Sequence, residues 1–446
     1  MKDNRDALNY GEMRIPRLFR KLFFPTLLGL LSGVLLNLAD GIFVGRGVGS
    51  DALAAINIAA PMFQVAAGIA LMFGSGVSVV AAIHLSKGNL KAANINVTQA
   101  FTMGLVLMGL VVVAINVFPR QAVALLGCSD KLYPMVHDYL LGVSPCLLFF
   151  VVELVGLFVI RLDGSPQYAM MLNVVAALVN IALDWLFVFP LGMGVFGAAV
   201  ATSLSALLGA MLVVHYLLRR SRQLRLYRPK FSAVALRLTA RNCGYMLRLG
   251  LPTFIAETAI CCMMVSGNFA FMRYLREDGV AAFSVACYLF PMIFMFGNAI
   301  AQSSLPIVSY NHGLGCADRV RETLRLSVVL ACALGLLMSV LGFVLAPALV
   351  SLFVGDLSAA TPIGSQGLPL FLLTCLPFTL NVVLIGYLQS LERYRPATVF
   401  MLLRGFIFVI PSFVVAGIPG LWLAEPLSET VSLVLLLGYM ARSRFQ

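Results

Sequence analysis

The sequence predicts an all-α polytopic membrane protein, with twelve transmembrane helices in two pseudo-symmetric six-helix lobes around a central cleft. Three observations predict this fold class. Hydrophobic residues make up 61% of the 446-residue chain and charged residues only 11%, whereas soluble domains carry about 25% charged residues. Apolar runs near the roughly 20 residues that a spanning helix needs recur along the chain. The second half repeats polar landmarks of the first, as in membrane proteins built from internal repeats.

The first half of the chain accounts for six of the expected helices. Residues 1–21 form a polar, basic N-terminal segment. The apolar run that follows is too long for a signal peptide and lacks a small-residue cleavage site, so we expect it to be retained. Residues 22–218 then form the N-lobe. Its spans are expected near 22–44, interrupted by Pro25, and near 52–83, 97–118, 139–160, 168–189 and 197–218.

A basic segment, residues 219–248, separates the two lobes. It holds nine Lys or Arg and no acid, which favours a cytoplasmic linker beside anionic lipid over a nucleic-acid contact. Residues 249–441 form the C-lobe, and 442–446 form a cytoplasmic tail. The C-lobe spans are expected near 250–272, 280–310, 324–345, 368–388, 399–415 and 421–439.

The two halves share landmarks in one register. Superimposing Pro25 on Pro252 also brings Asp51 onto Asp278. Matches between Ala residues are common by chance in this composition, but coincident Pro and Asp residues are not. The halves are therefore expected to be structural repeats.

Loop charges predict the orientation of the chain. With twelve helices and a cytoplasmic N-terminus, 25 of the 31 Lys and Arg residues fall on the inside and five on the outside, leaving Arg404 within a helix. This is a strong positive-inside bias. We therefore expect a multi-pass protein of the bacterial inner membrane with both termini in the cytoplasm.

Polar residues inside the predicted spans mark a candidate ion site. Asn180 and Asp184 are four residues apart and share one face of a helix. At about 1.5 Å of rise per residue, Asp40, Asp184 and Thr202 lie in the same outer layer of the membrane, with Asn180 one turn deeper. Intramembrane carboxylates usually mark ion or substrate paths, and these oxygens suit H⁺ or Na⁺. A purely structural role for the two acids, and a bond from Thr202 to its own backbone, are the alternatives.

Other buried acids are candidates for substrate contacts. Glu153 and Glu257 lie deeper in their spans, where either could meet a cationic substrate or pair with Arg404. The roles of Arg404, Glu425 and Glu429 stay open, and Glu425 is placed near the outer interface. The nine Cys residues have no metal or disulfide spacing, which indicates small core residues.

Three sequence motifs carry a resemblance to a known family. Pro25 and Asp40 precede the run VGRGVGSDALAA at 44–55, LGLP at 249–252 opens the second half, and PIVSYNHG at 306–313 closes the eighth span. In this order and spacing the chain resembles multidrug and toxic compound extrusion (MATE) transporters over almost its whole length. The resemblance implies two lobes that alternate between inward and outward openings. It also implies a bend of the first helix at Pro25.

The resemblance assigns the N-lobe ion site to the same four residues that depth selects, Asp40, Asn180, Asp184 and Thr202. Some relatives instead use acids in the seventh and tenth helices. Glu257 could stand for the first of these, but the tenth helix offers only Asn381. This departure favours coupling through the N-lobe.

The leading expectation is a secondary antiporter that exports amphipathic, cationic compounds, such as drugs and other xenobiotics, in exchange for H⁺ or Na⁺. The alternative is a flippase for a lipid-linked saccharide, but such a protein should show several basic residues in its cavity. An enzyme is not expected, because the chain has no HExxH, GxSxG or paired Asp motif. No cofactor and no nucleic-acid partner are expected, and the chain is expected to act as a monomer in the lipid bilayer.

Overall fold

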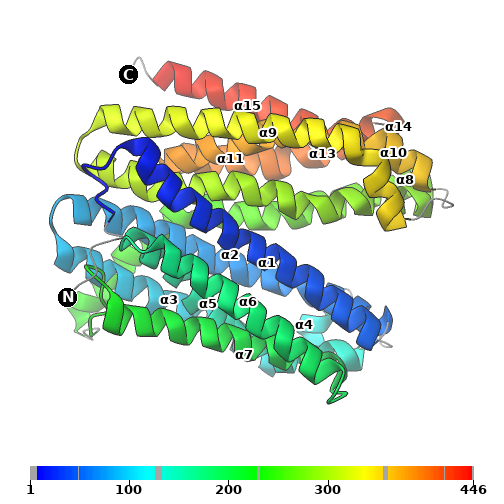
Figure 1. The fold of residues 1–446 in the computed structure, drawn as a ribbon, viewed down its shortest axis with the longest axis horizontal. Coiled ribbons are helices and arrows are strands. Elements are labelled where there is room, and N and C mark those ends of the chain that lie inside the picture. The colour runs from blue at the N-terminus through cyan, green and yellow to red at the C-terminus, as the bar shows by residue number, and fades with distance from the viewer. Residues whose placement is uncertain are drawn as a thin grey trace. The chain divides into compact units, whose positions relative to one another are not determined.

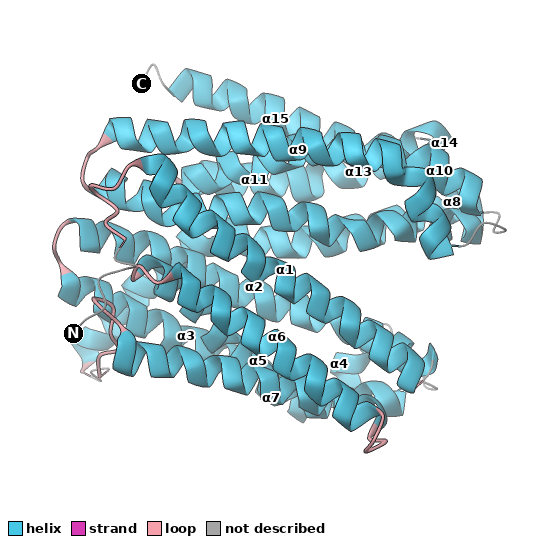
Figure 2. Cartoon of the chain, viewed as in Figure 1, coloured by secondary structure: helices cyan, strands magenta, loops and turns pink. Residues whose placement is uncertain are grey.

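The structure is a computed structural model that describes residues 8–48, 50–125, 133–228, 232–354, 360–415 and 417–443. Over these residues the chain consists of helices joined by short loops and turns, without a strand (Figure 2). Twelve of the described helical segments are long and apolar enough to cross a membrane. This confirms the predicted all-α, twelve-span fold.

Contacts divide the chain into two units, which are described separately. The N-unit comprises Met1–Phe254 and Ser309–Cys316, and the C-unit comprises Ile255–Val308 and Ala317–Gln446. The N-unit contains α1 (Ile15–Gly47), α2 (Ser50–Ser86), α3 (Leu90–Val117), α4 (Pro119–Leu125), α5 (Tyr133–Leu162), α6 (Pro166–Val188), α7 (Gly194–His215) and the π-helical turn η2 (Tyr216–Arg220).

The C-unit contains most of α8 (Ala233–Gly313) and all later elements. These are α9 (Ala317–Val354), α10 (Ala360–Phe371), η3 (Leu372–Thr374), α11 (Cys375–Ser390), α12 (Tyr394–Leu402), η4 (Leu403–Phe408), α13 (Val409–Val415), α14 (Gly417–Gly420), η5 (Leu421–Leu423) and α15 (Ala424–Ser443). The last three expected spans are thus each divided between two or more helical elements.

The expected seventh and eighth spans are joined in α8. Arg276 interrupts the helix with φ 55° and ψ −148°, a conformation that residues other than Gly rarely adopt. The two membrane-length segments on either side are Ala233–Arg276 and Asp278–Gly313. The break therefore lies where the sequence analysis places the loop between these spans.

The first helix begins earlier than expected. α1 begins at Ile15 rather than near residue 22, with Pro16 in its first turn, where a missing backbone N–H costs nothing. Ile15, Leu18, Phe19 and Leu22 are buried, and their spacing places them on one helical face. The other positions hold the basic residues Arg17, Arg20 and Lys21. These charges lower the hydropathy of the segment, so its amphipathic helical character was not recognised from the sequence.

Small residues let the helices of the N-unit approach closely. α7 contacts both α5 and α6, and the three run alongside one another (Figure 1). A Cβ atom at Gly142 of α5 would lie 2.8 Å from the Cβ of Ala199 on α7, and one at Gly156 would overlap Val213. Close packing through small residues is the usual way in which helices associate in membranes.

The basic segment after η2 is bound to the N-unit at its beginning. The Asp163 carboxylate accepts bonds from the Tyr216 hydroxyl (2.7 Å) and from three backbone N–H groups, those of Arg222, Gln223 and Leu224 (2.8, 2.8 and 2.9 Å). Next along the chain, the Arg225 N–H donates to Asn94 Oδ1 at 2.6 Å. Residues 221–225 are therefore fixed by side chains of the helical bundle.

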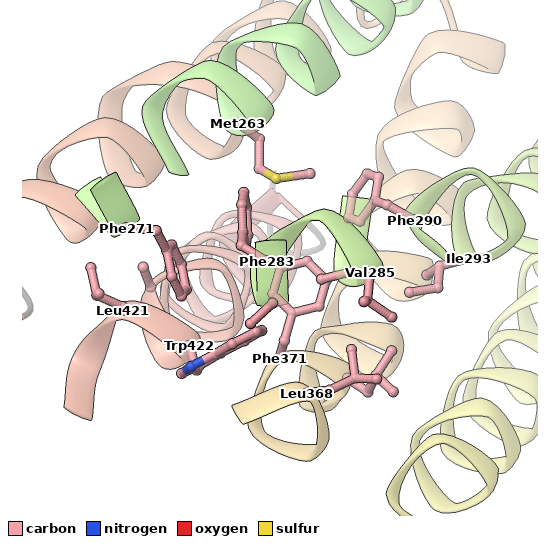
Figure 3. Close-up of a cluster of buried hydrophobic side chains, with 14 of the residues drawn as sticks. Met263, Phe271, Phe283, Val285, Phe290, Ile293, Leu368, Phe371, Leu421 and Trp422 are labelled. Atoms are coloured by element: carbon pink, nitrogen blue, oxygen red, sulfur yellow. The ribbon is translucent and has the colours of Figure 1, made fainter. Parts of the chain in front are cut away.

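An aromatic cluster forms much of the core of the C-unit (Figure 3). Phe271 stacks on Phe283 with ring centres 4.6 Å apart and meets Trp422 edge-on at 4.8 Å. A side chain at Gly367 would overlap the indole ring of Trp422. The cluster thus fixes the start of the last span, three residues before Glu425.

Candidate functional site

The face of α6 that carries Asn180 and Asp184 points into the N-unit. Asn180 is 1% exposed and Asp184 is fully buried, whereas Leu178 and Trp185 on the other side of the helix are more than half exposed. The four-residue spacing of the amide and the carboxylate predicts that they share one face of the helix, and the structure turns this face inwards.

Asn180 links Asp184 to α7. With its amide nitrogen turned towards Asp184, Asn180 donates to Asp184 Oδ2 at 2.9 Å and accepts from the Thr202 backbone N–H at 3.2 Å. This orientation gives both ends of the amide a complementary partner. The Thr202 hydroxyl donates to Ala198 O at 3.0 Å, so it satisfies its own helix, as the structural alternative for this residue anticipated.

Asp40 of α1 joins this group. Its carboxyl group is close enough to that of Asp184 for the two to interact electrostatically. Tyr139 of α5 lies within electrostatic range of both acids. Tyr139 is buried against Phe63, with ring centres 6.3 Å apart. The structure therefore brings together the four residues that the sequence selected and adds a tyrosine that the sequence analysis treated as part of an apolar run.

The arrangement leaves acceptor capacity unused. Within the described part of the chain, Asp40 Oδ1 and Asp184 Oδ1 are buried and have no hydrogen-bond partner. An apolar cluster that includes Val44, Val188 and Val195 packs around this region. Two ionised carboxylates in such surroundings repel each other and lack solvation, so the site can lower its energy by taking up a proton or a cation.

Glu153 lies elsewhere in the N-unit, about two turns of α5 beyond Cys146. The Cys146 thiol donates to Thr202 O at 3.7 Å. Glu153 is buried against α7, where a Cβ atom at Gly209 would come within 2.6 Å of its carboxyl carbon. Gly209 thus provides the space that the carboxyl group occupies.

The C-unit places its ionisable groups differently from the sequence-based alternatives. Within the C-unit, Arg404 binds Glu429 rather than Glu257, with Nη2 and Nε donating to Glu429 Oε1 at 2.7 and 2.9 Å. Glu257 is buried on α8. Glu425 is 4% exposed. It lies in the first turn of α15, where the aromatic cluster at Trp422 packs, so it is buried inside the C-unit.

No group of three or more His, Cys, Asp or Glu side chains with the arrangement of a metal site occurs among the described residues. A Na⁺ ion at the N-unit site would therefore also need the amide oxygen of Asn180 and oxygens of α7 as ligands.

Comparison with known proteins places these features in a family. The MatE family model matches residues 25–186 and 252–415. The two matched ranges begin at Pro25 and Pro252, the residues that the internal repeat superimposes. The family model therefore recognises each half of the chain in the same register.

Relatives and solved structures cover nearly the whole chain. It is 26% identical over 442 residues to a FAD transporter of Shewanella oneidensis, covering 96% of this chain and 94% of the relative. It is 22% identical over 437 residues to the multidrug export protein MepA of Staphylococcus aureus strain N315, covering 94% and 92%.

Two structures have the same fold. An outward-facing multidrug resistance MATE family transporter matches with a TM-score of 0.89 at 20% identity, covering 97% of both chains. A transporter of the MOP superfamily from Pyrococcus furiosus, described as having a binding pocket of reverse polarity, matches with a TM-score of 0.89 at 20% identity, covering 97% and 96%.

Proposed function

Because this chain belongs to the MATE family of membrane transporters, we propose that it is an antiporter that exports amphipathic cationic compounds in exchange for H⁺ or Na⁺. As a member of this family it is a transporter and not an enzyme. The antiport mechanism and the charge of the substrate are our proposals.

The pair formed by the partly buried Asp40 and the fully buried Asp184 is the observation that supports coupling. Each carboxyl group has an unpartnered buried oxygen in the described structure. Asn180 binds the other oxygen of Asp184 and links that residue to α7. When the site is open to the outside, a proton or Na⁺ neutralises the pair. A neutral pair costs less to enclose, which favours the inward-facing state after the substrate has left. The two lobes would alternate around this step.

The charge balance of the membrane interior supports a cationic substrate. Glu153 and Glu257 are buried acids in separate units. Arg404 has its charge engaged by Glu429. A flippase for a lipid-linked diphosphate would need unpaired cations, and the pairing of Arg404 disfavours that alternative.

The Shewanella relative favours a second candidate, export of a flavin dinucleotide, which is anionic and aromatic. The two candidates differ in substrate charge. Vesicles that take up a cationic dye such as ethidium and not FAD would support the first candidate, and the reverse would support the second.

We further propose that one chain is the functional unit, since both matched halves lie in it. We place it in the bacterial inner membrane with both termini in the cytoplasm, because basic residues are concentrated on one side.

The coupling proposal is tested in inside-out vesicles with a pH gradient and a Na⁺ gradient imposed separately. Asp40→Asn and Asp184→Asn should each reduce gradient-driven transport to the level of vesicles without the protein. Asp138→Asn removes an exposed acid of α5 and should leave transport unchanged. Near wild-type transport by either site variant under both gradients would contradict the coupling role.

A further inference from the structure

A small cavity lies inside the C-unit, whereas the proposed coupling site belongs to the N-unit. Its volume is about 20 Å³, room for roughly one water molecule. Phe290, Phe294 and Phe378 line its apolar part, and three ionisable groups line the rest, Arg404, Glu425 and Glu429. Met263 and Phe290, which connect it to the aromatic core, are labelled in Figure 3.

The charge of Arg404 is engaged by one of the two acids. Its Nη2 and Nε atoms donate to Glu429 at 2.7 to 3.1 Å. Its guanidinium carbon lies 4.4 Å from the centre of the Phe378 ring, a favourable cation–π position. Asn381 of α11 completes the set by donating to Glu429 Oε2 at 2.6 Å. Glu429 is therefore fully paired as a carboxylate.

Glu425 has no such compensation. It lies four residues before Glu429 on α15, and its Oε2 atom is buried without a hydrogen-bond partner in the described structure. The electrostatic interactions that reach it come from Glu429 and Arg404. An ionised Glu425 would add a second negative charge beside a single, already paired cation, and burial of an unpaired charge is strongly unfavourable.

We propose that Glu425 is a second proton-binding site, which carries a proton while this cavity is closed and exchanges it with water when the cavity opens. In the exchange the O–H bond of the carboxyl group breaks and the proton passes to water. The site differs from the Asp40–Asp184 pair in its unit, its helix and its partner groups.

A proton fits this site better than a metal cation. The unpartnered oxygens at the cluster are Glu425 Oε2 and Asn381 Oδ1, too few for a hard cation, and the Arg404 guanidinium would repel one. The other elements that contact α15 add no charged competitor. The sequences of α10, η3, η5 and α13 contain no titratable residue, and α11 contains Cys375 and Tyr387. α8 lines the cavity with Ala256, Ala259, Ile260 and Met263, and its nearest acid in sequence is Glu257.

Infrared spectroscopy of the purified full-length protein in lipid nanodiscs tests the proposal without a transport assay. A protonated carboxyl group has a C=O stretching band that shifts when H₂O is replaced by D₂O. At neutral pH, Glu425→Gln should remove one component of this band, and Glu322→Gln, at an exposed acid, should remove none. Asp40→Asn with Asp184→Asn should leave the Glu425 component in place, so this proposal stands or fails separately from N-unit coupling.

A second variant tests why Glu425 holds a proton, namely that Glu429 engages the charge of Arg404. Glu429→Gln frees Arg404 to pair with Glu425, so Glu425 should ionise and the same component should disappear although Glu425 is unchanged. Glu425→Asp should keep a component at a shifted position and serves if Glu425→Gln does not fold. A Glu425→Gln spectrum that superimposes on the wild type, or a component that persists in Glu429→Gln, would overturn the proposal.

Discussion

Glu153 is a buried acid whose place depends on a neighbouring glycine. Because Gly209 leaves the space that the carboxyl group fills, Gly209→Ala should displace Glu153. If Glu153 contacts cationic substrates, Gly209→Ala and Glu153→Gln should change the same subset of exported compounds. The measurement is a transport profile over a panel of cationic dyes.

The matched control for this pair is Gly109→Ala on α3. A Cβ atom there meets nothing within 4 Å, so the change tests the general effect of an added methyl group in a helix. A substrate profile altered equally by Gly109→Ala would remove the argument for Glu153.

Glu257 is the corresponding acid of the C-unit. We expect Glu257→Gln to change which cationic compounds are recognised while gradient-driven cycling partly persists. Measuring substrate profiles and coupling in the same vesicles separates the two effects. Loss of coupling in Glu257→Gln, with Asp184→Asn tolerated, would move the ion site to the other lobe.

Whether a residue's place in a site could be predicted depended on whether the residue belongs to a local sequence pattern. Asn180 and Asp184 could be found because a four-residue spacing places two polar groups on one face of an apolar helix. Tyr139 was missed because an aromatic residue in an apolar run looks like core, although its depth matches that of Asp40. The Arg404–Glu429 pair could not be predicted, since a charge partner on another helix leaves no local pattern.

At the scale of elements, Asp163 fixes the connection between α5 and the basic segment. Asp163→Ala should leave three backbone N–H groups without their acceptor, whereas the Tyr216 hydroxyl keeps Ser165 Oγ as a partner at 2.8 Å. An unsatisfied buried donor costs about 1–3 kcal/mol. Of the three residues only Leu224 is buried, so the free energy of unfolding should fall by about 1–3 kcal/mol. Thermal unfolding of the purified protein measures this.

Asp318→Ala is the control for that change, because the Asp318 side chain is fully exposed and its removal should leave the melting temperature nearly unchanged. Equal melting temperatures for Asp163→Ala and the wild type would show that the connection contributes little to stability.

Tyr10 belongs to the same region: its hydroxyl donates to Arg161 O at 2.6 Å. Burial raises its pKa above the usual value, which keeps it a neutral donor over the physiological pH range.

Helix number was predictable, but helix detail was not. Hydropathy identifies twelve apolar runs. Each of them is expected to be a helix, because a segment inside the membrane must satisfy its own backbone hydrogen bonds. It does not reveal the π-helical turn η4 at Arg404. This turn contains a close helix contact, because a Cβ atom at Gly405 would lie 2.5 Å from the Cβ of Ala259. The early start of α1 was hidden for a different reason, since its basic residues lowered the mean hydropathy of an amphipathic turn.

For the whole molecule, the internal repeat explains the fold but not the distribution of charge. Pro25 and Pro252 begin the two matched halves, yet the position of Asp40 corresponds to Gly267 in the second half. A side chain at Gly267 would overlap Phe283, a member of the aromatic cluster. The equivalent of the proposed ion site is thus occupied by an apolar core, and the buried acids of the C-unit lie on other helices.

Orientation is the property of the whole chain that the sequence predicts most directly, through 25 inside and five outside basic residues among the 31. In a variant without other Cys residues, Arg225→Cys should resist membrane-impermeant thiol reagents in intact cells. The Arg225 side chain is exposed, and its backbone bond to Asn94 does not depend on the side chain. The substitution should therefore leave the local fold intact.

The opposite end of the bundle provides the matched position. Leu191 lies in the turn between α6 and α7 and is 57% exposed, so Leu191→Cys should be labelled from outside in the same cells. Both positions should react after the membrane is permeabilised, which shows that the Arg225→Cys thiol is accessible to the reagent. Labelling of Arg225→Cys and protection of Leu191→Cys in intact cells would reverse the orientation. The proposed ion site would then open towards the cytoplasm, because Asp184 and Thr202 lie at the end of α6 and α7 that this turn connects.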